Sequence, residues 1–405
     1  PSPFNADIVL TNPPFGSRIG VKDREILKQY DLGHEWIFDQ NNERWIQQES
    51  LQVSQDPQIL FLELGIKLLK PGGLLGIILP EGMFGNKKSS YVWDFVLKNC
   101  EIEVLIDCPR TTFQPDTDTK TNVVFIRKNK HKNSSQVWIS VAKNVGHDRR
   151  GRKFSTKGIS IANDFEIIGS SYKTKNSKWW SKCTLTNKYY LIPRYYYGKN
   201  SSELSALITQ PDGKSRLFNE LISNGDIIIR KGVEVGAEFY GTGKIPFVRT
   251  SDITNWEISM NPTNGVSTEV YEQYKSKQKL KPGDILLVVD GRYKIGKTAI
   301  LHNYNCKCLI QSHFLIISTT PSSPINNYEL LYILNLPQVL EQIRNLVFIQ
   351  STLASIGNRV RELIIPLPKK TPKWKSTIRE FRESIETRAR LLDQLKLLES
   401  NEFDV

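Results

Sequence analysis

The sequence is poor in cysteine, and it lacks long apolar runs. Its 405 residues contain five cysteines, an odd number scattered along the chain, which argues against a disulfide framework and favours a reduced, cytoplasmic protein. Cys306 and Cys308 form a C-x-C without a second pair, which predicts structural thiols rather than a metal site. The sequence has no run of about 18 apolar residues and no signal-peptide pattern. We therefore expect neither a membrane span nor a membrane partner.

Positive charge, by contrast, is in excess. Lysine and arginine number 55 against 42 aspartates and glutamates, which gives a formal charge of +13. A soluble protein with this balance is usually drawn to a polyanion, and nucleic acid is the first candidate. Charge alone does not specify the partner, because many basic proteins never touch DNA. The chain is also long enough to bury at least two cores, so we expect two domains plus extensions.

Apolar patterns in the first third of the chain predict alternating strands and helices. Continuous apolar runs suit buried parallel strands, and apolar residues at helical spacing predict a helix that ends at the Pro-Gly-Gly of 71–73. The last two strands have no helix between them, so an antiparallel hairpin is expected there. The predicted order is strand 7–11, helix 57–70, strand 74–80, helix 89–98 with Ser89 or Ser90 as N-cap, strand 101–108 and strand 121–128. This order indicates half of a doubly wound α/β sheet.

The chain changes character near Tyr190, where we place a domain boundary. Before it, residues 16–56 show no clear period, and we interpret them as a long insertion or loop. After it, many short strands separated by Gly, Asn and Pro turns are expected. Residues 374–399 predict a long packing helix with a heptad seam that Arg388 and Glu399 interrupt. The apolar positions of the seam are Trp374, Ile378, Phe381, Ile385, Leu392 and Leu395.

The segment DIVLTNPPF at 7–15 suggests chemistry on an exocyclic amine. Such an amine is a poor nucleophile, and two acceptors aimed at its N–H bonds would stabilise the positive charge that develops when it is methylated. The side-chain carbonyl of Asn12 and the backbone carbonyl of Pro13 can form that pair, because proline fixes the backbone and brings no competing N–H. Pro14 is then a spacer that lines the cofactor side. Phe15 offers a flat face for a base extruded from the duplex.

NPPF after DIVLT resembles the catalytic motif of amino methyltransferases that use S-adenosylmethionine (SAM). ILFLELGIKLLKPGGLLGIILPEGMF and TKTNVVFIRK resemble the segments that follow it in adenine methyltransferases of type I and type IIG restriction–modification systems, over roughly residues 5–155. The resemblance implies a partial Rossmann-like class I methyltransferase sheet, with adenine as the target base. It implies SAM as the cofactor, with Asn12 and Pro14 beside it. By the same resemblance, the residues that border the pocket for the flipped base are Thr121, Asn122 and Phe125.

In that family a Gly-rich loop and an acidic strand end hold SAM, and both precede the Asn-Pro-Pro-Phe motif. Only eleven residues precede Asn12 in this sequence. A circular permutation would place the loop later, but the glycine cluster at 232–244 is followed by IPFVRTSDI and not by a helix. We therefore expect a chain that binds SAM poorly by itself. It would be the C-terminal part of a longer protein or one half of a split enzyme.

Residues 190–370 resemble the target-recognition domain of type I specificity subunits, and the helix that follows matches the spacer helix of that family. GKIPFVRTSDITNWEI, KLKPGDILLVVDGRYKIGKTAIL and FIQSTLASIGNRVRELIIPLPKK occur in the family's order. We expect some basic and neutral polar loop residues there to contact phosphates or base edges. The candidates are Arg230, Lys231, Lys244, Arg249, Thr250, Ser251, Arg292, Lys294, Lys297, Gln311, Ser312 and His313. Asp252 and Asp284 are expected to cap turns, and His313 is also typical of a structural histidine.

These features predict residues 1–189 as the C-terminal half of a SAM-dependent methyltransferase domain, 190–370 as a mixed α/β DNA target-recognition domain, and 371–405 as a spacer-like helix. The predicted function is site-specific adenine methylation of double-stranded DNA in a restriction–modification system. The expected partners are DNA and a missing N-terminal half, or a separate methyltransferase or restriction subunit. Two alternatives stay open. One is a non-catalytic specificity subunit that docks a separate methyltransferase, and the other is an RNA or protein methyltransferase with the same motif.

Overall fold

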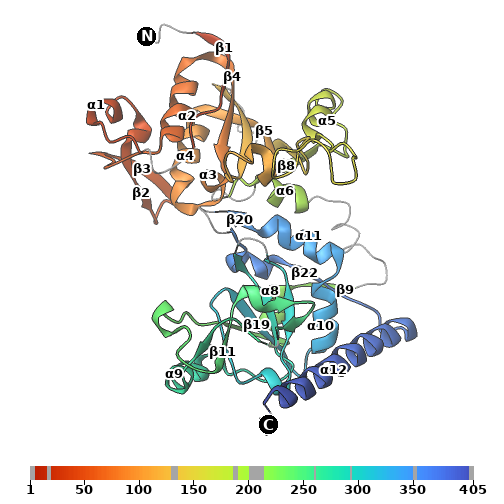
Figure 1. Cartoon of the computed structure of the whole chain (residues 1–405). Helices are drawn as coiled ribbons and strands as arrows, with labels where there is room; N and C mark the ends of the chain where they lie inside the picture. Colours follow the sequence, from red (N-terminus) through yellow and green to blue (C-terminus); the bar gives the residue numbers. More distant parts are fainter. Residues whose placement is uncertain are drawn as a thin grey trace. The chain divides into compact units, whose positions relative to one another are not determined.

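Figure 1 shows the fold of the chain in a computed structural model. The structure describes residues 5–15, 20–128, 136–185, 190–199, 214–259, 261–291, 294–349 and 354–400. Contacts within the chain divide it into two units. Unit 1 consists of Pro1–Ser201 and Phe348–Ser351, and unit 2 consists of Ser202–Val347 and Thr352–Val405.

Unit 1 is built on a six-stranded sheet with the strand order β1-β4-β6-β5-β7-β8. β1 is parallel to β4, and β5 is parallel to β7, while β6 is antiparallel to both β4 and β5. The strands are β1 (Ala6–Thr11), β4 (Leu69–Pro80), β5 (Cys100–Asp107), β6 (Thr121–Lys128), β7 (Gln136–Val141) and β8 (Ser181–Thr184). The predicted alternation and the antiparallel hairpin of β5 and β6 are confirmed. The sequence patterns missed β7 and β8, because both are short and lie among basic, polar turns.

Helices pack on this sheet where the apolar spacing predicted them. α2 (Pro57–Leu68) starts with proline at its first turn and packs on β4 and β1. α4 (Ser90–Asn99) buries Val92, Trp93 and Val96. Ser89 occupies its N-cap position but makes no side-chain cap bond, so the predicted capping bond is absent although its position is right. Further helices of the unit are α3 (Glu81–Gly85), α5 (Asp164–Ser170) and α6 (Pro193–Lys199).

Of the two interpretations of residues 16–56, an insertion or a loop, the loop is wrong for the described part, 20–56. This part contains α1 (Arg24–Leu27) and an antiparallel hairpin of β2 (His34–Asp39) and β3 (Arg44–Leu51). Buried Trp36 stacks on Tyr91 of α4, with 5.9 Å between the ring centroids. The hairpin packs its aromatic side chains on another element, so its sequence shows no periodic core of its own.

Unit 2 consists of small sheets and short helices, as the many predicted turns indicated. Its largest sheet has the strand order β10-β19-β15-β17, and a three-stranded sheet has the order β14-β11-β18. Two further pairs are β12 with β13 and β9 with β22. The strands are β9 (Lys214–Leu217), β10 (Ile227–Lys231), β11 (Ile245–Val248), β12 (Ile253–Thr254), β13 (Glu257–Ile258), β14 (Gly265–Val266), β15 (Ile285–Val288), β16 (Asp290–Gly291), β17 (Thr298–Ile300), β18 (Leu309–Ile310), β19 (Phe314–Thr319), β21 (Ala354–Ser355) and β22 (Ile364–Leu367). The helices are α8 (Phe218–Ser223), α9 (Thr268–Gln278), α10 (Asn327–Leu334) and α11 (Pro337–Leu346), followed by α12.

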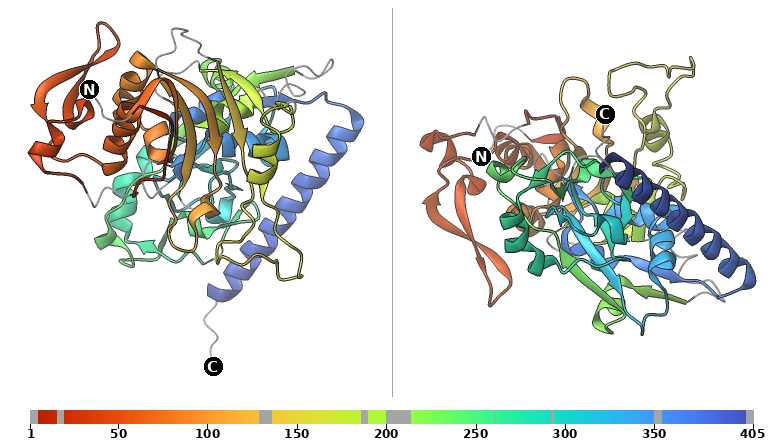
Figure 2. Two further views of the ribbon diagram at one scale, coloured as in Figure 1. Left: turned by 90° about the horizontal axis from the view of Figure 1, so that it is seen from above. Right: turned by 60° about the horizontal axis from the view of Figure 1, so that its bottom comes forward.

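The long helix α12 (Pro372–Ser400) ends the described chain, close to the predicted 374–399, and Figure 2 shows it as one straight rod. Its first half follows the predicted seam, because Ile378 and Ile385 are buried. Phe381 meets Tyr332 of α10 edge to face, with 5.3 Å between the ring centroids. Leu395 is 49% exposed, so the seam does not continue to the helix end within unit 2. None of the helices in the described part of the chain has the length and apolar character needed to cross a membrane.

Candidate active site at the carboxyl edge of the sheet

Three strands of unit 1 end at the same edge of the sheet, which we call the carboxyl edge. β1, β4 and β5 run in one direction and end at Thr11, Pro80 and Asp107, while β6 begins there with Thr121. In open α/β sheets, ligands bind outside the carboxyl ends of parallel strands. The Asn-Pro-Pro-Phe segment follows β1 directly, so the fold places it at the edge where such a site is expected.

The four motif residues present both polar and aromatic surface at this edge. Asn12 and Pro14 are exposed, Pro13 is buried, and Phe15 is half-buried. The ring of Phe15 lies edge to face against Phe113, with 5.4 Å between the centroids and 71° between the planes. The amide of Asn12 is therefore accessible, and the buried Pro13 fixes the backbone beside it.

The three residues that the resemblance assigned to the base pocket lie on β6 and do not share a face of the sheet. Successive strand residues point to opposite sides, so Thr121 and Phe125 face one side and Asn122 the other. Thr121 and Asn122 are fully buried, and Phe125 is half-buried. Among the described residues, neither amide atom of Asn122 has a hydrogen-bond partner. β4 separates β1 from β6, so these residues lie about 10 Å from the motif at the usual strand spacing.

A buried network of charges, which the sequence did not predict, lies at the same edge. The Arg194 guanidinium of α6 donates to Glu81 at 2.6 Å and to Asp107 at 2.7 Å. Glu81 directly follows β4, and Asp107 is the last residue of β5. Lys120 donates to Asp107 and to the Cys108 carbonyl. Two carboxylates and two cations therefore neutralise one another where the strands end.

Burial and pairing act in opposite directions on this network. Burial by itself raises the pKa of Glu81, but the charge and hydrogen bonds of Arg194 outweigh it and hold this pKa below its ordinary value. Burial lowers the pKa of Arg194, but the charges and hydrogen bonds of Glu81 and Asp107 raise this pKa by more than burial lowers it. The guanidinium therefore stays charged. Burial also raises the pKa of the Cys108 thiol to about 12, so this cysteine is a neutral thiol and not a nucleophile.

A short segment from far along the chain completes the network. β20 (Phe348–Ile349) belongs to unit 1, and the Ile349 amide donates to Glu81 at 2.7 Å. The Phe348 ring packs edge to face on Tyr190 and Tyr195, with centroid separations of 5.2 and 5.8 Å. The one sequence signal for this network was an acidic residue at or directly after the end of each of two buried strands.

Several predicted DNA-contact residues of unit 2 are occupied by internal partners. Arg230 pairs with Asp284 at 2.8 Å and donates to the Gln278 carbonyl at 2.9 Å. Lys294 donates to the carbonyls of Ser251 and Ile253, both at 2.9 Å. These contacts hold loops to the unit 2 core, and the prediction that Arg230 and Lys294 contact DNA stays a prediction.

The other predicted contacts of unit 2 differ in their exposure. Lys231, Lys244, Ser251 and Lys297 are exposed; Arg249, Thr250, Ser312 and His313 are half-buried; Gln311 is buried; and Arg292 lies outside the described residues. Ser312 donates to Glu234. Asp252 accepts from the Arg249 amide at 2.8 Å and Asp284 from the Lys281 amide at 3.0 Å, so both cap turns as predicted.

Neither a glycine-rich cofactor loop nor a metal centre is found in the described part of the chain. The glycine cluster at 232–244 leads through a single 3-10 turn (Ala237–Phe239) into β11, so it lacks the strand–loop–helix context of a phosphate-binding loop. No group of three or more His, Cys, Asp or Glu in the described ranges could hold a metal ion.

Comparisons with known proteins show what the region around this site is similar to. Residues 2–190 match the family model described as N-6 DNA Methylase. The type I restriction enzyme EcoEI methylase subunit of Escherichia coli is 26% identical over 134 residues, which cover 33% of this chain and 23% of that protein. The StySPI methylase subunit of Salmonella potsdam is 26% identical over 142 residues, which cover 33% and 22%. Residues 2–190 are therefore similar in sequence to N-6 DNA methylases, and the chain spans about a quarter of the length of the curated relatives that it matches.

Solved structures with weaker overall similarity include two restriction–modification proteins. The methyltransferase subunit of a type I system from Streptococcus thermophilus is 21% identical, covers 48% of this chain and 39% of its own, and gives a TM-score of 0.35. The type IIG restriction endonuclease BpuSI is 15% identical, covers 94% and 49%, and gives a TM-score of 0.39. Scores this low add nothing to the assignment, which depends on the sequence match and on the edge geometry.

Proposed function

We propose that this chain supplies the methyl-accepting site and the DNA-reading part of an adenine-specific DNA methyltransferase in a restriction–modification system. The observation that carries the proposal is the accessible Asn12 and the half-buried Phe15 at the carboxyl edge, inside the region that matches N-6 DNA methylases. The reaction is transfer of a methyl group from SAM to the 6-amino group of an adenine that has left the duplex.

The motif residues would act on the amine by hydrogen bonding and stacking. The Asn12 side-chain carbonyl and the Pro13 backbone carbonyl accept from the two N–H bonds, which stabilises the positive charge that develops on the nitrogen. Phe15 stacks on the base and offsets part of the cost of extruding it. The edge-to-face contact with Phe113 at 5.4 Å holds the Phe15 ring in place.

The described residues fit SAM only in part. SAM supplies the methyl group, and Asn12 and Pro14 would line its side of the site. Ile8 and Leu10 of β1 are 61% and 72% exposed, so apolar surface beside the motif is available to a further protein segment. The rest of the cofactor pocket would come from that segment, which belongs to the complete enzyme or to a partner subunit.

Residues 190–370 would read the DNA sequence, and 371–405 would serve as the spacer helix. Exposed Lys231, Lys244 and Lys297 are the best placed of the predicted phosphate contacts, because no described residue neutralises them. Arg230 and Lys294 would instead shape the recognition loops through their internal bonds.

The substitution Asn12→Ala tests the proposal in the complete enzyme, with the rest of the methyltransferase present. Loss of one of the two acceptors should lower methyl transfer from labelled SAM to duplex DNA by about 100-fold or more. DNA binding should be unchanged. Asn99→Ala, at an exposed position on α4, is the matched control and should methylate normally. Unchanged methylation in Asn12→Ala would support a non-catalytic specificity subunit instead.

A further inference from the structure

The loop between β7 and α5 carries an unusual concentration of positive charge. Residues 143–163, which we call the basic finger, contain six lysines and arginines and one aspartate, a net charge of +5. Phe154 and Ile159 of the basic finger are 59% and 65% exposed.

The basic finger is held in one shape by its own backbone. The Gly146 amide donates to the Ala162 carbonyl at 2.8 Å and closes its base. Two tight turns follow, each with a glycine in the left-handed region, Gly151 at φ +77° and Gly158 at φ +72°. The Asp148 carboxylate accepts from backbone amides inside the first turn. A loop organised in this way loses little conformational entropy when it binds a partner.

Most of the finger's cations have no acidic partner. Arg152 pairs with Asp148 at 2.7 Å. No described residue forms an ion pair with the exposed side chains of Arg149, Arg150, Lys153 and Lys157. Unpaired cations gathered on one loop repel one another, and a polyanion removes that repulsion.

The basic finger lies next to the Asn-Pro-Pro-Phe motif. A Cβ on Gly151 would stand only 3.3 Å from Pro115, so the first turn packs against the segment 114–115. That segment directly follows Phe113, whose ring contacts Phe15. Two contacts, Gly151 with Pro115 and Phe113 with Phe15, therefore connect the basic finger to the ring on which the extruded base would stack.

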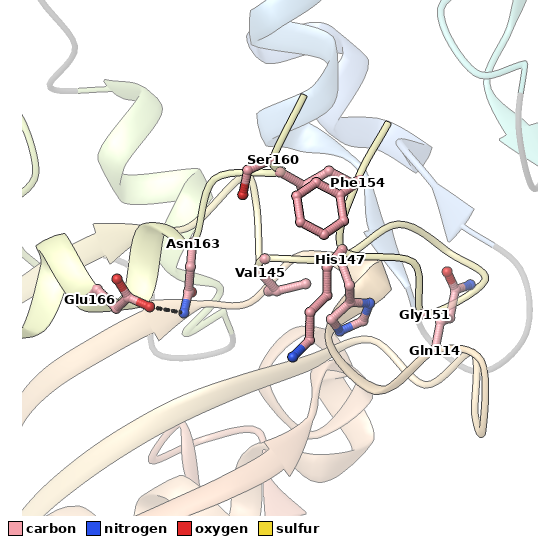
Figure 3. Close-up of a pocket in the computed structure, with 11 residues that line it drawn as sticks. Gln114, Val145, His147, Gly151, Phe154, Ser160, Asn163 and Glu166 are labelled. Carbon is pink, nitrogen blue, oxygen red and sulfur yellow. Dashed lines mark hydrogen bonds between the residues drawn. The ribbon is translucent and has the colours of Figure 1, made fainter. Parts of the chain in front are cut away.

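A cavity of about 430 Å³ lies between the basic finger and this segment (Figure 3). Figure 3 shows Gln114 and Glu166 at opposite ends of the space, with Phe154 and His147 between them. Lys153 also lines it. The volume is within the range of about 300–1,000 Å³ that holds small ligands. An aromatic ring and a lysine at one cavity suit a sugar with its phosphate.

We propose that the basic finger grips the sugar–phosphate backbone of double-stranded DNA beside the extruded base. This proposal rests on the proposed function, since it is the motif that places a base at Phe15. The cations supply phosphate contacts that carry no sequence information, and Phe154 supplies an apolar contact to the strand. Unit 1 thus holds DNA at the reacting base independently of the recognition residues of unit 2.

The test compares two triple variants of the full chain by fluorescence anisotropy on a labelled duplex of mixed sequence. The finger variant carries Arg149→Gln, Arg150→Gln and Lys153→Gln. The control carries Lys22→Gln, Arg24→Gln and Lys88→Gln, which removes three exposed cations of unit 1 outside the finger. Figures 1 and 2 place α1, which contains Arg24, on the flank of unit 1 opposite α5.

The finger variant should bind DNA more weakly and with a smaller dependence on salt. Each lost phosphate contact removes about 0.9 from the slope of log affinity against log salt, so three contacts remove about 2.7. Between about 50 and 200 mM salt, the affinity of this variant should fall about 40-fold less than that of the parent. The control should keep the parent's slope. Phe154→Ala should weaken binding without changing the slope.

Each other outcome has a distinct meaning. If the parent binds DNA and the finger variant keeps its slope and affinity, the basic finger is not a DNA contact, while the proposed function survives. If the finger variant loses binding to single-stranded RNA and not to the duplex, an RNA partner replaces this proposal. If the parent binds no duplex at all, both the finger proposal and DNA recognition fail together.

Discussion

Two buried glutamates, one in each unit, lie beside arginines, and yet their pKa values shift in opposite directions. The pKa of Glu81 in unit 1 lies below its ordinary value, whereas burial raises the pKa of Glu257 in unit 2 above it. Both side chains are at least 95% buried within their units, being 1% and 4% exposed. Burial alone therefore does not explain the difference.

The distances to the arginines explain it. Arg194 donates twice to Glu81 and the Ile349 amide donates once, at 2.7 Å. The nearest approach of Arg388 to Glu257 is 3.6 Å, too long for a hydrogen bond, and Glu257 Oε2 has no hydrogen-bond partner among the described residues. Glu257 Oε1 does accept from the Ile258 amide at 3.2 Å and from Asn305 at 3.1 Å, but these neutral donors do not offset its burial. A nearby charge offsets the cost of desolvation best when the charged group itself donates the hydrogen bonds.

The largest expected effect is a difference in stability between variants of the two arginines, Arg194 and Arg388. Arg194→Met leaves two buried carboxylates, Glu81 and Asp107, with Lys120 as their one remaining cation among the described residues, so the free energy of unfolding of unit 1 should fall by about 3–5 kcal/mol. Arg388→Met removes a looser contact and should lower that of unit 2 by about 1 kcal/mol. Urea unfolding of the full chain, followed by circular dichroism, measures both changes. Equal losses in the two variants would contradict the hydrogen-bond explanation.

Neutral isosteres of the two glutamates should act with opposite sign. The pKa of Glu81 is lowered in the fold, so its stabilisation is present above the unfolded value of about 4.3 and lost as pH falls below it. The pKa of Glu257 is raised, so its contribution is present at acid pH and lost as pH rises. At pH 7, Glu81→Gln should destabilise the fold, while Glu257→Gln should be neutral or stabilising by about 1 kcal/mol. Thermal unfolding between acid and neutral pH would show the opposite slopes, and a destabilising Glu257→Gln would argue against them.

The smallest effect concerns His302, whose Nε2 lies 3.6 Å from Glu257. Burial and the charge of Arg388 lower the pKa of His302, while Glu386 of α12 opposes them. The fold therefore favours the neutral ring, and unit 2 should lose up to about 1 kcal/mol as pH falls through the unfolded histidine value of about 6.5. His302→Gln should remove this decline and leave the acid titration of Glu81 unchanged. Melting curves of parent and variant above and below that pH measure it, and parallel declines would exclude His302 as the source.

The sequence predicted the strands and helices whose signals are local. The runs at 74–80 and 121–128 became parts of β4 and β6, and the spacing before Pro71 gave α2. The sequence did not predict the helix and hairpin of 20–56, because the aromatic residues of the hairpin pack on α4 and follow no regular apolar period. It also read Arg388 as an interruption of the α12 seam. In the fold this arginine donates to the Asn255 carbonyl at 2.8 Å and approaches Glu257.

The Asn-Pro-Pro-Phe motif was found from four adjacent letters, because its chemistry needs an amide, a fixed backbone and a ring in direct succession. The charge network was not found, because its members have no sequence relation to one another. Arg194 and Glu81 are 113 positions apart, and Ile349 and Glu81 are 268 apart. Their meeting depends on strand order and on a returning segment, which local patterns do not encode.

By itself, the sequence determined the order of strands and helices at the start of the chain, the excess of positive charge and the motif at the end of β1. All three follow from composition or from neighbours along the chain. Only the tertiary structure decided that β6 lies between β4 and β5, that the basic finger packs against the segment after Phe113, and that Glu81 accepts hydrogen bonds from an arginine while Glu257 does not. Those outcomes depend on packing and hydrogen-bond geometry between distant residues, which the fold alone brings together.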